Sequence, residues 1–352
     1  MVGATGAGTM RRWVKVSVAA AVVLGVGGYT AQPYVKEWAL IRSACGEGLP
    51  RDAVKQLTPE DSLLNAEESR NIKGLGSYTC EVTLAGGDTD GKRFVSMAAY
   101  TRRDDQDREL MSVFTENGFD SQSPLPGGLP GFVDQYGTIR LFLPCPDLPA
   151  DDGGRKRKLL VNISMGRTVL TGVPGAAHRL AVALSDVASD KLGCGAKPLK
   201  APEPETPLAD LENDSKMVPI AEAEGTPCGW VAGAGLPAGG NWQVAVAASS
   251  AAPSSRCDLS SAENGEDTPN PSRLAFASWY GDWSNRLTAD ENHGVPRSMT
   301  ATAQCEDEAA NYAVVGEQDI PGIDVGARQR MLKLFAQDEV RRRGCTGLRF
   351  HF

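Results

Sequence analysis

Eight cysteines constrain this chain more than any other feature: Cys45, Cys80, Cys145, Cys194, Cys228, Cys257, Cys305 and Cys345. All lie beyond residue 44, their number is even, and no two are closer than 29 residues. Such a set is typical of disulfides formed in an oxidising compartment. Zinc sites use closely spaced ligand pairs, so this spacing disfavours a metal centre. The sequence therefore predicts four disulfides, with no metal and no cofactor.

The first four cysteines match the last four, which indicates an internal repeat. Residues 175–194 align without a gap with residues 326–345. Both stretches carry apolar residues at helical spacing, among them Leu180, Leu184, Met331 and Phe335. Each stretch predicts an amphipathic helix that ends at a Gly-Cys pair, because glycine suits a left-handed helix cap.

Weaker matches between the two halves predict strands. Residues 93–100 match 273–280, since each run begins with Arg and ends with Tyr seven positions later. Residues 141–145 with 159–165 match 300–305 with 312–315. We therefore expect an α+β fold: an N-terminal transmembrane helix, then two tandem repeats, each a mainly antiparallel sheet covered by one or two helices.

The predicted domain organisation has five parts. They are a short cytoplasmic tail over 1–15, a transmembrane signal-anchor over 16–35, a first ectodomain repeat over 44–195, a proline-rich linker over 196–227 and a second repeat over 228–352. The linker holds six prolines among acidic residues, which favours an extended chain.

The membrane prediction depends on residues 16–35, which contain no charged side chain. Twenty residues at about 1.5 Å each can cross a hydrocarbon core of about 30 Å. Arg11, Arg12 and Lys15 precede this segment and favour a cytoplasmic N-terminus. A cleaved signal peptide is the alternative, although Val26 or Tyr29 would then lie three positions before the cut, where small residues are preferred.

The duplication limits how the cysteines pair. If equivalent cysteines pair equivalently and each unit folds independently, three pairings per unit remain of the 105 possible connectivities. We predict that the first cysteine of each unit bonds the second and the third bonds the fourth. The third lies on a strand and the fourth follows the helix that covers that sheet, so their disulfide would pin helix to sheet.

The net charge of −8 combines +4 over residues 1–43, five basic minus one acidic side chain, with −12 over the rest. An ectodomain of that sign is a poor partner for nucleic acid or anionic lipid.

The start of the first unit carries a resemblance. Cys45 lies before Leu49-Pro50 and a short predicted helix through Val54 and Leu57, and Cys80 precedes a strand. This pattern resembles uncharacterised cell-envelope proteins of streptomycete-type actinobacteria. The resemblance implies no catalytic residues. Unlike lipidated members, the chain has no usable lipid-attachment motif, because Arg42 takes the place of an apolar residue.

Two clusters are candidate ligand contacts. The first contains Trp279, Tyr280 and Trp283 with Asp282, and would form a stacking platform for a sugar ring or peptide unless it fills the core. Because Trp279 is out of phase with Tyr280 on a strand, we expect either Trp279 or Trp283, but not both, to be exposed. The second is the basic run 155–158, either a solvated loop or a contact for an anionic envelope polymer or phospholipid headgroups.

The three histidines lack the sequence context of a Ser-His-Asp site. We therefore expect a membrane-anchored, non-catalytic extracytoplasmic protein that binds an envelope ligand or a partner protein. A cell-wall-acting enzyme with a carboxylate site is the alternative, and it needs two acids facing each other in a cleft.

Overall fold

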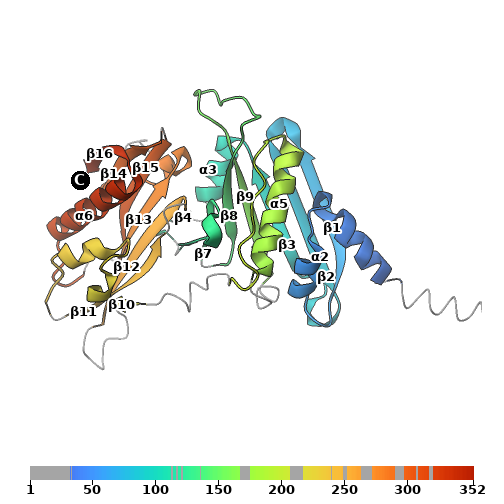
Figure 1. Ribbon diagram of the computed structural model, residues 1–352, viewed down its shortest axis with the longest axis horizontal. Coiled ribbons are helices and arrows are strands. Elements are labelled where there is room, and N and C mark those ends of the chain that lie inside the picture. Colours follow the sequence, from blue (N-terminus) through green and yellow to red (C-terminus); the bar gives the residue numbers. More distant parts are fainter. Residues whose placement is uncertain are drawn as a thin grey trace, which may run out of the picture.

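The computed structural model describes residues 32, 34–111, 114–115, 118–119, 122–134, 136–166, 175–206, 217–238, 240–248, 252–262, 272–289, 297–306, 308–316 and 320–352. These residues form two seven-stranded antiparallel sheets, one in each cysteine-bearing unit, and a small two-stranded sheet of β4 (Phe114–Thr115) and β5 (Gly118–Phe119). Figure 1 shows the two large sheets next to each other, each with a helix on its outer side.

The strand order in the first sheet is β1-β2-β3-β9-β8-β7-β6. The bounds are β1 (Leu63–Ile72), β2 (Ser77–Ala85), β3 (Arg93–Tyr100), β6 (Gln122–Pro124), β7 (Gly131–Asp134), β8 (Ile139–Pro144) and β9 (Lys158–Met165). The helical elements of this unit are a helix over residues 34–43, η1 (Ala44–Gly46), α2 (Arg51–Leu57), η2 (Lys73–Leu75), η3 (Gly87–Thr89), α3 (Arg103–Met111), η4 (Pro126–Gly128) and α5 (Ala176–Leu192).

The strand order in the second sheet is β10-β11-β12-β13-β15-β14-β16. The bounds are β10 (Val218–Pro219), β11 (Asn241–Ala248), β12 (Ser254–Ala262), β13 (Ser272–Tyr280), β14 (Thr300–Cys305), β15 (Glu308–Gly316) and β16 (Thr346–His351). The helical elements are η5 (Ile220–Ala223), η6 (Gly229–Gly233), η7 (Asp282–Arg286) and α6 (Val325–Arg343). Thus β10 and η5 form at the end of the predicted linker and belong to the second unit.

The predicted fold class, α+β with an N-terminal transmembrane helix and two helix-covered repeats, is wrong. The described chain consists of two β-rich domains with few helices, and none of the helices in this part is long and apolar enough to cross a membrane. The strand matches indicated only four strands per unit, because the others carry little period-2 signal; β1, for example, is mostly polar and exposed. The predicted segment 16–35 lies almost entirely outside the described residues.

The predicted disulfide pairing is confirmed. The bonds are Cys45–Cys80, Cys145–Cys194, Cys228–Cys257 and Cys305–Cys345, and no cysteine is free. Gly193 and Gly344 adopt the left-handed conformation at the ends of α5 and α6, with φ of 66° in both. Each glycine turns the chain so that the following cysteine reaches its partner, Cys145 directly after β8 or Cys305 at the end of β14.

The strand register corrects one detail of the repeat. Cys80 lies opposite Met97, and Cys257 lies opposite Phe276, so Met97 and Phe276 are equivalent. In this equivalence Tyr100 corresponds to Trp279, and not to Tyr280 as the match between 93–100 and 273–280 predicts. The sequence match aligns identical residues, whereas the strand register aligns residues that point to the same face of the sheet. A shift of one residue exchanges the two faces of a strand.

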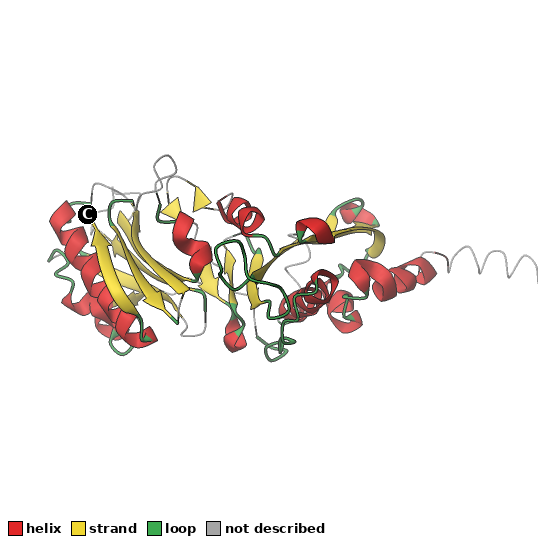
Figure 2. Ribbon diagram, turned by 90° about the horizontal axis from the view of Figure 1, so that it is seen from above, coloured by secondary structure: helices red, strands yellow, loops and turns green. Residues whose placement is uncertain are grey.

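Three apolar cores hold the units together. One lies between the first sheet and α2 with α5, and a second lies between the second sheet and α6 with η6. The third joins the free faces of the two sheets and includes Phe132, Phe142, Leu160 and Trp279. The layers are therefore helix, sheet, sheet and helix, as Figures 1 and 2 show from two directions. The two units therefore pack against each other, because each sheet has an apolar second face that must be covered.

Candidate functional site

A cleft of about 710 Å³ opens at the junction of the two units. The first unit contributes Thr101 and the start of α3, Phe142 of β8, and residues 151–158, which connect β8 to β9. The second unit contributes Asp282 and Trp283 of η7, with Glu306 and Glu308 at the turn between β14 and β15. Both sequence clusters therefore meet here, the basic run 155–158 from one side and Asp282 with Trp283 from the other.

The floor of the cleft is aromatic and belongs to the core between the sheets. The rings of Phe142 and Trp283 stack at 4.6 Å between centroids, with an interplanar angle of 24°. Trp283 is only 5% exposed, and its indole Nε1 donates a hydrogen bond of 2.8 Å to the Tyr280 carbonyl oxygen. The indole is therefore held in place, with a rigid apolar base beneath the polar walls.

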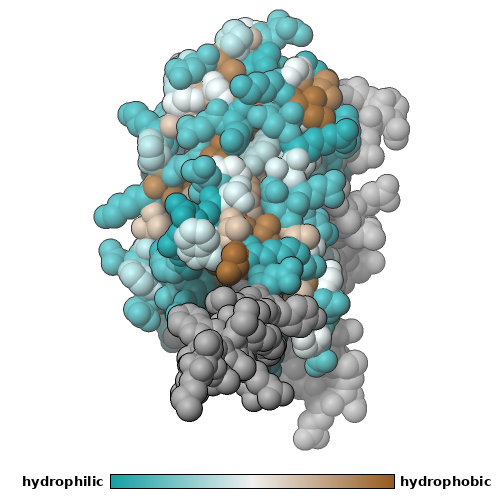
Figure 3. Space-filling model, turned by 90° about the vertical axis from the view of Figure 1, so that its right-hand side faces the viewer, coloured by the Kyte–Doolittle hydropathy of each residue, from teal (hydrophilic) through white to brown (hydrophobic). Residues whose placement is uncertain are grey.

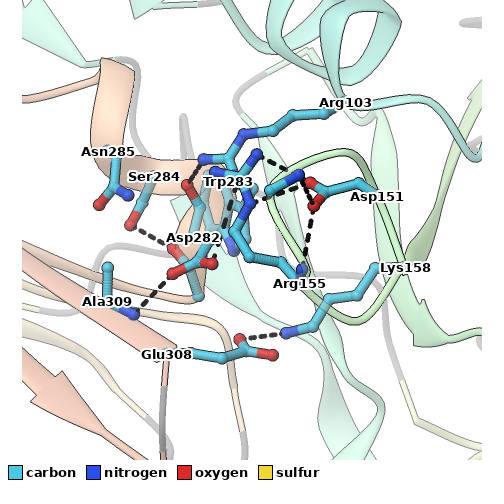
Figure 4. Close-up of polar contacts among 12 residues, drawn as sticks. Arg103, Asp151, Arg155, Lys158, Asp282, Trp283, Ser284, Asn285, Glu308 and Ala309 are labelled. Atoms are coloured by element: carbon cyan, nitrogen blue, oxygen red, sulfur yellow. Dashed lines mark hydrogen bonds and ion pairs between the residues drawn. The ribbon is translucent and has the colours of Figure 1, made fainter.

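Ion pairs between the two units connect the two walls of the cleft, as Figure 4 shows. Lys158 of β9 pairs with Glu308 of β15, and Arg103 of α3 pairs with Asp282 of η7 at 3.9 Å. Arg103 also donates a hydrogen bond to the Asp282 carbonyl oxygen. The Asp282 carboxylate accepts a 3.0 Å hydrogen bond from the backbone N–H of Ala309. Asp282 and Glu308 of the second unit are thus paired with cations of the first.

A second layer of charge lies behind this wall. Asp107 of α3 is 2% exposed and lies 2.9 Å from Arg286 of η7 and 3.8 Å from Arg103. Burial raises the pKa of the Asp107 carboxyl, and the two guanidinium groups oppose that rise. Asp107 therefore links α3 to η7 beneath the cleft.

The loop 151–158 folds around Asp151. Its carboxylate accepts hydrogen bonds from the backbone N–H groups of Gly153 at 2.9 Å and Arg155 at 3.0 Å, and from Arg155 Nε at 2.9 Å. The bonds with Arg155, chiefly the side-chain one, lower the pKa of Asp151 to about 2. Lys156 is exposed, and Arg157 Nε is buried with no hydrogen-bond partner among the described residues. These two cations stay available for a ligand.

Trp279 lies below the cleft, not in it. Its side chain is 1% exposed and belongs to the core that joins the two sheets. The expectation that Trp279 or Trp283 is exposed is therefore wrong. Trp279 does point away from Tyr280, as the strand phase predicts, but both faces of the second sheet are covered, one by α6 and one by the first unit.

Tyr280 faces α6 and takes no part in the cleft. Its hydroxyl donates a hydrogen bond to Glu339, which is fully buried and also pairs with Arg342. The guanidinium of Arg343 lies 3.5 Å from the centre of the Tyr280 ring. Burial, and then the negative charge of Glu339, raise the pKa of Tyr280 well above its usual value. This cluster attaches the helix to the sheet.

The remaining candidates lie elsewhere. His178 is 1% exposed in α5, where burial lowers its pKa; the His351 ring contacts Thr302 at 3.2 Å; and His293 lies outside the described residues. The described part of the chain contains no cluster of side chains that could hold a metal ion. Sequence reasoning missed Arg103 and Glu308, because neither carries a local signal and their partners are more than a hundred residues away.

Comparison of the chain with known protein families, curated proteins and solved structures found no match.

Proposed function

We propose that this protein is a non-catalytic extracytoplasmic binding protein, and that the cleft between its units takes a polar envelope ligand with charges of both signs, such as a peptide attached to a glycan. The observation that carries this proposal is the meeting of the run 155–158 with Asp282 and Trp283 across the cleft. Six cations and six acids line the cleft, so a ligand of one sign would meet repulsion as well as attraction.

The state of three of the six cleft carboxylates favours binding over hydrolysis. A hydrolase of the carboxylate type needs one acid free to donate a proton and another free to act as base or nucleophile. Here Asp282 and Glu308 pair with Arg103 and Lys158, and Asp151 is held ionised by Arg155. The cleft therefore offers fixed charges and an aromatic floor, which suit recognition.

The proposed location follows from the disulfides and the N-terminal sequence. Four disulfides with no free cysteine are typical of an oxidising, extracytoplasmic environment. The uncharged stretch 16–35 supports attachment to a membrane. We propose that the two units lie on the outer side of that membrane.

Titration of the full chain with purified wall fragments tests this function. Soluble peptide–glycan fragments should bind, while polyglutamate and polylysine, each of one sign, should bind more weakly. Lys156→Ala with Arg157→Ala should weaken fragment binding about tenfold, since two partly exposed charge contacts together contribute about 1.4 kcal/mol. Isothermal calorimetry measures these affinities.

The matched control is Lys55→Ala with Lys200→Ala, which removes two exposed lysines outside the cleft and should leave binding unchanged. An equal loss in both double variants would remove the cleft from the proposal. Release of shorter products from the fragments would instead favour the enzyme.

A further inference from the structure

The helix over residues 34–43 gathers exposed apolar side chains on one face. Tyr34 is 64% exposed, Val35 63% and Trp38 50%, and they are three of the seven exposed large apolar side chains among the described residues. Their spacing of three and four positions brings them to one side of the helix. Single exposed apolar residues are normal, but a group of this kind marks an interaction surface.

The other side of this helix is attached to the first unit. Leu40 and Ile41 pack against its apolar core. Lys36 Nζ lies 3.1 Å from Asn65 Oδ1, and the Glu37 carboxylate accepts a hydrogen bond of 3.2 Å from the backbone N–H of Leu64. The orientation of the helix is therefore fixed, and its apolar face points away from the protein.

Two guanidinium groups flank the exposed tryptophan. The Arg42 guanidinium lies 4.5 Å from the centre of the Trp38 ring, and that of Arg51 lies 5.6 Å away. Neither arginine has an acidic partner among the described residues. An amphipathic ring with arginines beside it is the combination that membrane interfaces favour, because the ring enters the boundary region while the cations reach lipid phosphates.

The position of the helix in the molecule also suits contact with a membrane. It directly continues the uncharged stretch 16–35 and lies at the end of the molecule opposite the second unit, as Figures 1 and 2 show. Figure 3 views the molecule from this end, where the rest of the surface is mostly hydrophilic. Apart from residues 1–43 the chain carries −12, so an anionic membrane would repel the rest of the protein.

We infer that the surface formed by Tyr34, Val35, Trp38, Arg42 and Arg51 lies in the phospholipid headgroup region of a membrane and sets the orientation of the two units. This inference rests on the proposed membrane location. The helix then holds the cleft away from the lipid surface, which makes an envelope polymer a better partner for the basic run 155–158 than phospholipid headgroups.

Quenching of Trp38 by brominated lipids tests the inference. The full chain is reconstituted into phosphatidylcholine vesicles with a minor share of phosphatidylglycerol, brominated near the headgroup end of the acyl chains. The difference in tryptophan fluorescence between the wild type and the Trp38→Phe variant gives the emission of Trp38. This emission should be about twofold lower in brominated vesicles than in unbrominated ones, because interfacial side chains reach about 5–10 Å into the bilayer.

The matched control adds Tyr136→Trp to the Trp38→Phe variant, since Tyr136 is 65% exposed in the turn between β7 and β8. This new tryptophan should not be quenched. If the chain floats with the vesicles and Trp38 is not quenched, or the control is quenched equally, the inference is overturned while the membrane location stands. If the chain does not float, the membrane location fails, and the inference fails with it.

Discussion

In the first unit the strand beside β8 is β7, which precedes β8 in the chain, whereas in the second unit the strand beside β14 is β16, which follows α6. The middles of the two sheets agree: β2-β3-β9-β8 has the order and direction of β12-β13-β15-β14. The disulfides also lie at equivalent places. The duplicated units thus keep the strands that carry cysteines and differ at the sheet edges.

The sheet edges also take part in the junction of the two units. In the first unit β6 extends the sheet beyond β7 and contacts β11 and β12 of the second unit. In the described part of the second unit, no strand occupies the equivalent place beyond β16. Divergence at one edge has therefore given one copy a surface that the other copy covers. The cleft lies at this junction and has no counterpart within either unit.

The largest expected effect tests the equivalence of the disulfides. Cys145–Cys194 spans 49 residues and Cys305–Cys345 spans 40. Replacing either pair by serine should lower the free energy of unfolding by about 4 kcal/mol in the chain-entropy estimate. Urea unfolding of the two double variants measures both losses. Losses that differ by more than about 2 kcal/mol would show that the two bonds are not equivalent in the fold.

A second comparison uses two residues at equivalent strand positions. Trp279 is buried beneath the cleft, while Tyr100 is only half-buried. Trp279→Ala should reduce the free energy of unfolding by about 3 to 4 kcal/mol, because it leaves a cavity between the sheets. Tyr100→Ala should cost about 1 kcal/mol, nearer the range of surface sites. Thermal and urea unfolding measure both losses. Similar losses would contradict the conclusion that burial of Trp279 at the junction stabilises the protein.

The predictions that the structure confirms are those supported by features present in both copies of the repeat. Cysteine order, the Gly193 and Gly344 caps and the helix periods all recur in both halves, so each half supported the other. The edge strands do not recur, and β1 offers no clear alternation because much of it is exposed. Sequence patterns alone therefore undercounted the strands.

The cleft was predictable only in part. Asp282, Trp283 and the run 155–158 stand out by composition, and all of them line it. Their meeting was not predictable, because the two units were treated as independent. The error at Trp279 has the same cause: strand phase shows that it faces away from Tyr280, but not that a second sheet covers that face.

The helices of the two units also differ where they touch their sheets. Glu339 of α6 is buried against Tyr280 and Arg342, while its equivalent in α5, Ala188, contacts only an apolar core. Glu339→Ala should cost about 3 kcal/mol, because it leaves the Tyr280 hydroxyl and the partly buried guanidinium groups of Arg342 and Arg343 without their partner. Urea unfolding measures the loss. Arg341→Ala, at a 74% exposed side chain on the same helix, should cost almost nothing.

A smaller effect concerns the pH dependence of stability in the first unit. The pKa of Asp107 is raised in the folded protein, chiefly by burial. The unfolded chain therefore releases this proton first, and stability from Asp107 is lost as the pH rises from the ordinary carboxyl range through the folded pKa. Relative to Asp107→Asn, the wild type should lose stability as the pH rises through and above the ordinary carboxyl range near pH 4. A relative gain over that range would mean that Arg103 and Arg286 outweigh burial.

The smallest effect concerns how firmly charge holds the two units together. Lys158 and Glu308 are 27% and 34% exposed, so water and salt screen their attraction. A double-mutant cycle with Lys158→Ala and Glu308→Ala should give a coupling of about 0.5 kcal/mol, falling further in high salt. The aromatic core between the sheets, and not this ion pair, would then account for most of the cohesion of the junction. A coupling several times larger that resists salt would reverse that order and would make the charged rim of the cleft the main link between the units.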